Sequence, residues 1–252
     1  MQPSDPINIV RSWIAAARRI VVLTAVGIST HSGIPDFRGP QGVWTTDPAA
    51  EKQSTLQNYL ADPQVRRAAW RSRLAHPAWQ ARPNRGHLAL VELERRGKLH
   101  ALITQNIDEL HQLAGNADER IIEVHGTMRR VMCWGCGQRS PMQDVLERVR
   151  AGDADPVCRE CGGILKSDTI SFGQALVPAV IDRAMDAAAE ADLLLAVGST
   201  LQVYPVAGVV PVAKNAGARI VIMNNQPTPM DALADALLRR PIGEVLPAVC
   251  AA

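Results

Sequence analysis

The apolar positions of this chain fall into short runs that alternate with longer stretches of helical spacing. Apolar runs of strand length occur at residues 21–24, 99–103, 121–124, 192–197 and 219–223. Helical spacing is found at residues 7–19, 84–94, 180–190 and 231–238. Uninterrupted apolar runs are typical of parallel strands that are buried on both faces. The alternation therefore predicts an α/β fold with a doubly wound, Rossmann-like parallel sheet.

Residues 44–82 break this alternation. They mix Thr, Asp, Pro and Arg with helical stretches and contain no strand pattern, which predicts a helical insertion. The length of 252 residues, with 47% hydrophobic and 21% charged residues, fits one sizeable domain with such an insertion. A formal net charge of +2 gives no field that would favour nucleic acid or an anionic membrane. With no leader pattern and no apolar span of membrane length, we expect a cytoplasmic protein.

Four of the five cysteines form two Cys-x-x-Cys pairs, Cys133 with Cys136 and Cys158 with Cys161. Two such pairs supply the four thiolates of a closed, structural zinc site, whereas a reducing compartment disfavours disulfides. A redox dithiol is the alternative, but it would need one pair at a helix N-terminus. No cluster of basic and aromatic residues surrounds the pairs, which argues against a nucleic-acid module.

Polar residues directly follow several of the predicted strands. Ser29 lies in the loop after the first strand, Asn106 and Asp108 follow the second, His125 follows the third and Asn224 follows the last. The carboxyl ends of parallel strands meet at one edge of the sheet, where α/β proteins bind ligands, and Gly and Ser let backbone N–H groups approach a phosphate. Each residue has a simpler alternative, since Asn and Asp commonly cap helices and a lone histidine is often structural. Their recurrence at one edge favours a nucleotide-binding catalytic cleft.

The motifs at these strand ends resemble those of the sirtuins of bacterial type, which are NAD-dependent protein-lysine deacylases. The shared stretches include Ser-Gly-Ile-Pro-Asp-Phe-Arg at residues 32–38, Thr-Gln-Asn-Ile-Asp at 104–108 and His-Gly at 125–126. A further stretch, residues 168–174, is similar to the family segment that pairs with the substrate backbone. The resemblance covers nearly the whole chain.

The resemblance implies a division of the chain. A Rossmann-like NAD-binding domain would comprise residues 1–40, 83–128 and 164–252. The helical insertion 41–82 and the zinc-binding insertion 129–163 would form a small domain.

The resemblance also implies residue roles. His125 would be the general base and Asn106 would lie at the nicotinamide ribose, which makes these two the catalytic residues. The cofactor-binding residues would be Ala25, Val26, Gly27, Ser29, Ile34, Asp36, Phe37, Arg38, Gln105, Ile107, Asp108, Gly198, Ser199, Thr200, Asn224 and Ile242. The substrate-binding residues would be Ile170, Phe172, Gly173, Trp70 and Arg73, and the metal ligands Cys133, Cys136, Cys158 and Cys161.

The implied function is deacylation of protein lysines with NAD and one structural zinc ion, giving nicotinamide, free lysine and O-acyl-ADP-ribose. We expect acylated-lysine proteins as substrates, no membrane or specific nucleic acid partner, and a monomer. The alternatives are an ADP-ribosyltransferase or NAD glycohydrolase, and a non-catalytic module that binds NAD or ADP-ribose.

Two departures from the family pattern lead to further expectations. Ala25-Val26 replaces the family's Gly-Ala, so if residue 25 needs a positive φ the loop is strained and NAD affinity is weakened. Trp70 and Arg73 stand where desuccinylating members have Tyr-x-x-Arg. Because the tyrosine hydroxyl is lost, we expect acetyl and short neutral acyl groups to be preferred.

Overall fold

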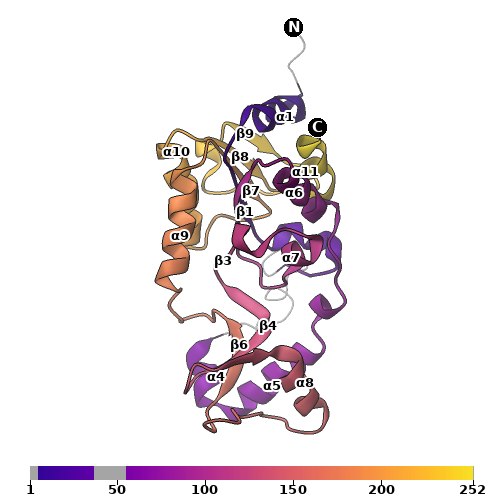
Figure 1. Cartoon of the computed structure of the whole chain (residues 1–252), viewed down its shortest axis with the longest axis vertical. Coiled ribbons are helices and arrows are strands. Elements are labelled where there is room, and N and C mark those ends of the chain that lie inside the picture. The colour runs from indigo at the N-terminus through magenta and orange to yellow at the C-terminus, as the bar shows by residue number, and fades with distance from the viewer. Residues whose placement is uncertain (1–4, 37–54, 252) are drawn as a thin grey trace.

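The computed structural model describes residues 5–36 and 55–251, and Figure 1 shows their arrangement. The α-helices are α1 (Pro6–Ala16), α4 (Leu56–Ala61), α5 (Pro63–Leu74), α6 (Arg85–Arg95), α7 (Leu110–Ala114), α8 (Met142–Arg150), α9 (Pro178–Ala189), α10 (Val209–Asn215) and α11 (Ile242–Cys250). The strands are β1 (Ile20–Thr24), β2 (Leu99–Thr104), β3 (Ile121–Glu123), β4 (Gly126–Cys133), β5 (Arg139–Pro141), β6 (Leu165–Thr169), β7 (Leu193–Val197), β8 (Arg219–Met223) and β9 (Ala236–Leu238). Short 3-10 turns lie at Val26–Ile28, Thr30–Ser32, Pro77–Trp79, Asp118–Arg120, Val206–Gly208 and Asp231–Leu233.

Six strands form one sheet in the order β3-β2-β1-β7-β8-β9, and every neighbouring pair in it is parallel. All five residues of β1 and of β7 are buried, as uninterrupted apolar strands in the middle of a parallel sheet should be. The strand order reverses between β1 and β7, and this reversal is the topological switch point at which α/β sheets bind ligands. The predicted α/β, Rossmann-like fold is confirmed.

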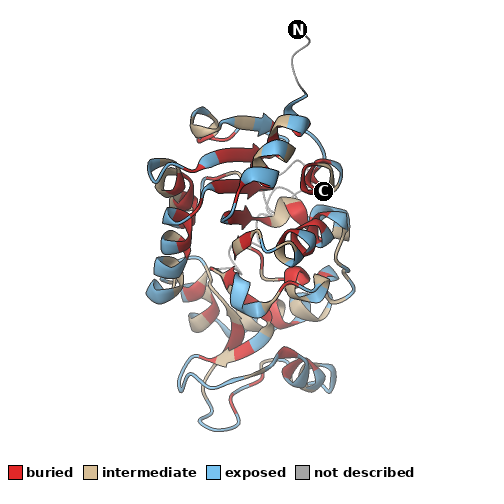
Figure 2. Ribbon diagram, turned by 45° about the horizontal axis from the view of Figure 1, so that its top comes forward, coloured by how far each residue is buried: buried red, intermediate tan, exposed pale blue. Residues whose placement is uncertain are grey.

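The two faces of the sheet carry separate apolar cores. Ile20 and Val22 of β1 pack in a cluster with residues of α1, α6 and α11. The intervening Val21 and Leu23 pack in a second cluster with α9 and α10, because successive side chains of a strand point to opposite faces. Figure 1 shows α9 and α10 on one side of the sheet and α6 and α11 on the other. Figure 2 shows that the buried residues of the strands lie between these layers.

Helices α1 and α6 begin at residues whose side chains cap them. The Asp5 side chain accepts a hydrogen bond from the Ile7 N–H, and Pro6 occupies the first turn of α1. At α6 the Asn84 side chain accepts from the Gly86 N–H, and the His87 ring accepts from the Asn84 N–H. His87 is fully buried and completes this capping box.

The predicted helix at residues 231–238 is wrong. The segment makes one 3-10 turn at Asp231–Leu233, becomes extended at Ala234 and then forms β9. The Asp235 carboxylate accepts from the Ile220 N–H at 2.7 Å, and the Asp235 N–H donates to the Ile220 carbonyl at 2.8 Å. These two bonds hold the chain beside β8, and β9 becomes the parallel partner at that edge. The helical spacing of residues 231–238 does not predict this pairing.

A second sheet is antiparallel and has the order β5-β4-β6. It lies at the lower end of Figure 1 together with α4, α5 and α8. Its apolar cluster consists of buried residues from these elements and the cysteine turns: Trp70, Val131, Cys133, Met142, Val145, Leu146, Cys158 and Leu165. No helix among the described residues has the length and apolar character needed to cross a membrane.

Candidate active site

The backbones of Gly27 and Gly198 touch at the switch point between β1 and β7. The Gly27 N–H donates to the Gly198 carbonyl at 3.1 Å, and the Ala25 N–H donates to the Val197 carbonyl at 3.1 Å. A Cβ on Gly27 would lie 2.6 Å from the Gly198 Cα, and Gly198 itself has a φ of +65°. The two glycines therefore form a close backbone contact, the Gly27–Gly198 contact, that no side chain would allow, and it lies at the edge of the sheet where α/β proteins bind nucleotides.

The expected strain at Ala25 is absent. Its φ of −136° and ψ of −172° are extended, so alanine adopts this backbone without cost. Val26 begins the 3-10 turn that follows, and its half-buried side chain packs against a cluster formed by Ile34, Ala78, Leu110 and Met128. Backbone strain at Ala25 therefore gives no reason to expect weakened nucleotide affinity.

Asn106 follows β2 and is held in one orientation. Its N–H donates to Thr104 Oγ1 at 3.1 Å, and its Nδ2 donates to the Ala25 carbonyl at 3.2 Å and to Ser29 Oγ at 3.1 Å. Asn106 is only 8% exposed. Because both protons of the amide are used inside the protein, Oδ1 is the group that Asn106 can offer to a ligand.

Asp108 lies on the same loop and shares Ser29 with Asn106. Ser29 Oγ donates to Asp108 Oδ2 at 2.8 Å, and the Leu110 N–H donates to Asp108 Oδ1 at 2.9 Å. Burial raises the pKa of Asp108, although both hydrogen bonds and the charge of Arg129 act in the opposite direction. The neighbouring Ile107 is half-buried, and its carbonyl accepts from the Met128 N–H at 3.0 Å.

His125 follows β3, and its ring lies against the Asn106 loop. His125 Nδ1 is 3.0 Å from the Gln105 carbonyl, which can only accept, so Nδ1 carries the proton and Nε2 keeps a lone pair. Burial lowers the pKa of His125, which keeps the ring neutral near neutral pH. Gln105 also donates from Nε2 to Ser199 Oγ at 3.1 Å, so one side chain links the loops after β2 and β7.

The other predicted cofactor-binding residues lie along the same edge. Ile34 and Asp36 line an open cavity of about 310 Å³, together with Thr30, Gly33 and Pro35. Phe37 and Arg38 lie outside the described residues.

The far end of this edge is formed by the loops after β7 and β8. Ser199 is buried and Thr200 is half-buried at the end of β7, while Ile242 is buried at the start of α11. Asn224 follows β8 and donates to the Gln226 carbonyl at 2.9 Å. Arg239, which sequence reasoning did not identify, donates to the carbonyls of both Asn224 and Gln226 and orders this loop.

The predicted substrate residues divide into two groups. Ile170, Phe172 and Gly173 follow β6, and the Ile170 N–H donates to the His125 carbonyl at 2.8 Å, which joins this segment to the candidate base. Phe172 is 44% exposed. Trp70, in contrast, has no exposed surface and lies in the core of the small sheet.

Arg73 stacks next to that core. Its guanidinium lies 5.0 Å from the Trp70 ring and 5.5 Å from the Tyr59 ring, and it donates to Ser167 Oγ at 3.3 Å.

Sequence reasoning also missed three residues behind Asn106. Thr24 and Thr104 are register partners at the ends of β1 and β2, and their hydroxyls are 2.9 Å apart. The ring of His111 on α7 lies 3.0 Å from Thr24 Oγ1. Threonine as the last residue of two adjacent strands was the available signal, but it is also ordinary strand composition.

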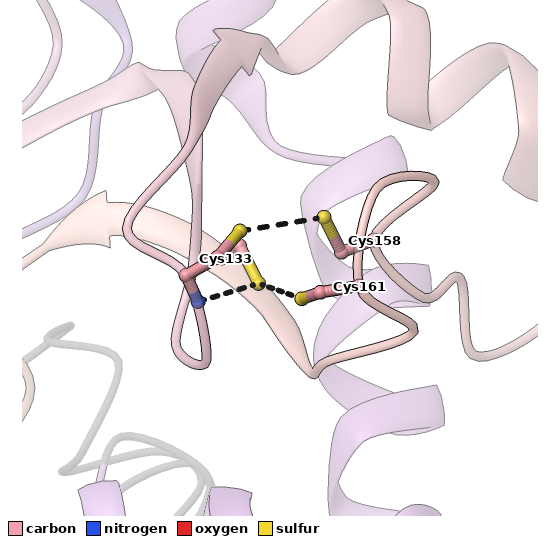
Figure 3. Close-up of side chains that lie close together, drawn as sticks. Cys133, Cys158 and Cys161 are labelled. Atoms are coloured by element: carbon pink, nitrogen blue, oxygen red, sulfur yellow. Dashed lines mark hydrogen bonds between the residues drawn. The ribbon is translucent and has the colours of Figure 1, made fainter.

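The four paired cysteines converge on one point. Their sulfur atoms all lie within 4.8 Å of one another, with Cys133 and Cys161 at 3.5 Å and Cys136 and Cys158 at 3.8 Å. Figure 3 shows Cys133 facing Cys161, with Cys158 next to Cys161, across the gap between two turns. Four thiolates at about 2.3 Å from a tetrahedral zinc ion would be separated by about 3.8 Å, so this geometry fits one zinc ion. Neither pair begins a helix, which disfavours the redox alternative.

Comparisons with known proteins agree with this geometry. The model of the Sir2 family matches residues 25–205. The chain is 48% identical to NAD-dependent protein deacetylase 2 of Streptomyces coelicolor over 230 residues, which cover 91% of this chain and 95% of that protein.

Solved structures are similarly close. A structure described as the structural basis for the mechanism and regulation of Sir2 enzymes has a TM-score of 0.88 at 36% identity, covering 98% of this chain and 97% of that one. A Sir2 complex with a deacetylated p53 peptide and 3′-O-acetyl ADP ribose has a TM-score of 0.88 at 31% identity, covering 96% of each chain.

We predict that the purified protein contains one zinc ion per chain and that Cys133→Ala removes it. A thiolate set reduced to three leaves the metal weakly held, and the small sheet loses part of its stability. Elemental analysis and thermal unfolding measure both effects. Cys250→Ala is the matched control, because Cys250 is the last residue of α11, lies in the core of the large sheet and should leave the zinc content unchanged. A parent protein that contains no zinc, together with a Cys133→Ala variant that melts at the same temperature as the parent, would contradict the zinc site.

Proposed function

The chain belongs to the Sir2 family, and on that premise we propose that it is an NAD-dependent protein-lysine deacetylase. The observation that carries the proposal is the meeting of Asn106, Asp108 and His125 beside the Gly27–Gly198 contact. A nucleotide-binding edge alone would suit any cofactor enzyme. An oriented amide, a buried carboxyl and a neutral imidazole next to it suit a reaction at the sugar of that nucleotide.

The residues present fit NAD. When bound, NAD would supply a ribose carbon that releases nicotinamide and bonds to the acyl oxygen, and with one water consumed the products are nicotinamide, free lysine and O-acyl-ADP-ribose. Ser199 and Thr200, next to the contact between Gly27 and Gly198, would offer hydroxyls to the diphosphate. Asn224 and Ile242 would bind the adenosine end, while Ile34 and Asp36 would line the cavity at the other end.

Asn106 would act at the nicotinamide ribose through Oδ1. Its Nδ2 is fixed to Ala25 and Ser29, so the oxygen is already oriented before any ligand binds. An acceptor that is positioned in advance favours a transition state with positive charge on the sugar, because no reorganisation is required.

Asp108 and the backbone at Ile107 would bind the nicotinamide carboxamide. The raised pKa of the Asp108 carboxyl shows that its charged form is poorly solvated. A hydrogen bond from a carboxamide N–H would replace part of the lost solvation, so binding of the carboxamide would be favourable.

His125 would be the general base. Its Nδ1–H is bound to the Gln105 carbonyl, so Nε2 is the atom that accepts a proton. The same carbonyl fixes the ring orientation, and the lowered pKa keeps the ring in its basic form.

The substrate peptide would lie along residues 170–173. This segment leaves β6 beside the His125 carbonyl and exposes the Phe172 ring. An extended peptide that pairs with such an edge is recognised mainly through its backbone, so many sequences can be accepted.

We further propose the remaining features of the enzyme. The NAD-binding domain would comprise residues 1–40, 83–128 and 164–252, and the small domain residues 41–82 and 129–163, in keeping with the two separate sheets. Thiolate metal ligands suit a reducing compartment, so we place the protein in the cytoplasm, as a monomer without a nucleic-acid partner.

The proposal is tested by incubating the protein with NAD and an acetyl-lysine peptide and following nicotinamide and peptide mass together. Equal amounts of nicotinamide and deacetylated peptide support it. Nicotinamide released without the peptide would instead indicate a glycohydrolase, and NAD binding without turnover would indicate a binding module.

His125→Ala should lower kcat for deacetylation by about 10²-fold or more, since general base catalysis typically contributes that much. NAD binding, measured by calorimetry, should be retained. Because burial lowers the pKa of His125, parent activity should rise with pH as Nε2 loses its proton, with the midpoint of the rise below the ordinary imidazole pKa of about 6.5. His100→Ala, at the opposite end of β2, is the control and should keep the parent rate. A His125→Ala variant with parent activity would exclude the residue as the base.

Gly27→Ala should weaken NAD binding by about tenfold or more, because the new Cβ would press on the Gly198 backbone. The double variant Ala25→Gly with Val26→Ala should change NAD affinity by less than about threefold, since Ala25 is already extended. Calorimetric titration with NAD compares the two. If the double variant gained tenfold in affinity, Val26 would be shown to obstruct the nucleotide.

The enzyme should deacetylate an acetyl-lysine peptide faster than its succinyl-lysine counterpart. Trp70 offers no hydroxyl beside Arg73, and the Tyr59 hydroxyl already donates to the Leu165 carbonyl at 2.7 Å. A succinyl carboxylate would therefore meet Arg73 without the second donor, whose hydrogen bond is worth about 1 kcal/mol. Peptides that differ only in the acyl group measure the preference, and fastest cleavage of the succinyl peptide would reverse it.

A further inference from the structure

Two buried histidines lie on neighbouring helices behind the Asn106 loop. His87 on α6 and His111 on α7 are 0% and 1% exposed, and their ring centroids are 5.0 Å apart. Burial lowers the pKa of His87 to about 4 and lowers the pKa of His111 well below its ordinary value. Both rings are therefore neutral at physiological pH, and each carries one donor and one acceptor nitrogen.

The hydrogen bonds assign the proton of His111. Thr24 Oγ1 donates its single proton to Thr104 Oγ1 at 2.9 Å. It can therefore only accept from His111 Nε2, which lies 3.0 Å away, so Nε2 carries the proton and Nδ1 is a bare acceptor.

The series of hydrogen bonds that starts at His111 ends at Asn106. Thr104 Oγ1 receives the Thr24 hydroxyl and also accepts the Asn106 N–H at 3.1 Å. The direction of the Thr104 lone pairs, and with it the backbone position of Asn106, depends on the bond from His111 through Thr24.

His87 packs beside His111. Its Nδ1 accepts from the Asn84 N–H at 3.3 Å, so the proton of the neutral ring is on Nε2. Among the described residues, His87 Nε2 and His111 Nδ1 have no hydrogen-bond partner, although the ring centroids are only 5.0 Å apart. The hydrogen bond to Thr24 is therefore the one that orients the His111 ring.

We propose that His111 is a positioning residue that fixes Asn106 for the chemical step through Thr24 and Thr104. This inference rests on the proposed deacetylase function.

If His111 served packing alone, an apolar side chain of similar size could replace it and kcat would be kept. The kinetic test therefore compares His111→Leu, which removes the donor, with His111→Gln, whose amide N–H can still reach Thr24. Thr24→Val removes the middle link with almost no change in shape.

We expect His111→Leu and Thr24→Val to lower kcat about tenfold or more, because small displacements of a reacting group are costly, while the Kd for NAD changes less than about threefold. His111→Gln should recover most of the lost kcat. Val249→Ala, a core change in α11 away from the loop, controls for stability and should lower the melting temperature while kcat is kept. Parent kcat in both His111→Leu and Thr24→Val, assayed well below their melting temperatures, would overturn the proposal.

A second measurement does not depend on activity. Nitrogen-15 NMR of the histidine rings should show both His87 and His111 neutral and protonated on Nε2, and Thr24→Val should shift the His111 Nε2–H signal. His111 protonated on Nδ1 would overturn the proposal even in an active enzyme. A parent protein with the expected ring protonation but no deacetylation would refute the proposed function and leave the hydrogen-bond path itself established.

Discussion

The contact between the Gly27 and Gly198 backbones is the constraint on which the rest of the site depends. It closes the end of β1 against the end of β7, where the strand order reverses, and neither position has room for a Cβ. The loop that leaves Gly27 carries Ser29, and Ser29 holds both Asn106 and Asp108. The positions of two of the candidate site residues therefore follow from how closely two strands approach.

Buried polar groups surround this contact, and nearly all of their protons are directed inward. In a low-dielectric interior such a network is strong when each group has a partner, and it resists rearrangement for the same reason. Asn106 uses three donors within the protein and Asp108 accepts two, so each retains little freedom to turn. A site that must bind an extended nucleotide gains by having these groups oriented before the ligand arrives.

The parts of this structure that the sequence predicted are those in which local pattern and sheet topology agree. β2, β7 and β8 lie where apolar runs predicted them, and the candidate site residues follow the strands as expected. The helix proposed at residues 231–238 is wrong because the edge of β8, which lies outside that segment, pairs with its end as β9. The strain proposed at Ala25 came from a family pattern and not from a φ angle, which only coordinates provide. The link from His111 to Thr24 could not be predicted, since 87 positions separate the two residues and neither belongs to a motif.

The small sheet is joined to the candidate base, His125, at both β4 and β6. β4 begins immediately after His125, and the segment that leaves β6 returns to the His125 carbonyl at Ile170. The apolar cluster of this sheet includes Cys133 and Cys158, so the zinc site and the core of the module share residues. A metal that holds these turns also holds β4 and β6 in register, and β6 leads directly to the edge at residues 170–173. A zinc ion with four protein ligands has no position left for substrate, so its influence on the reaction passes through the geometry of that edge.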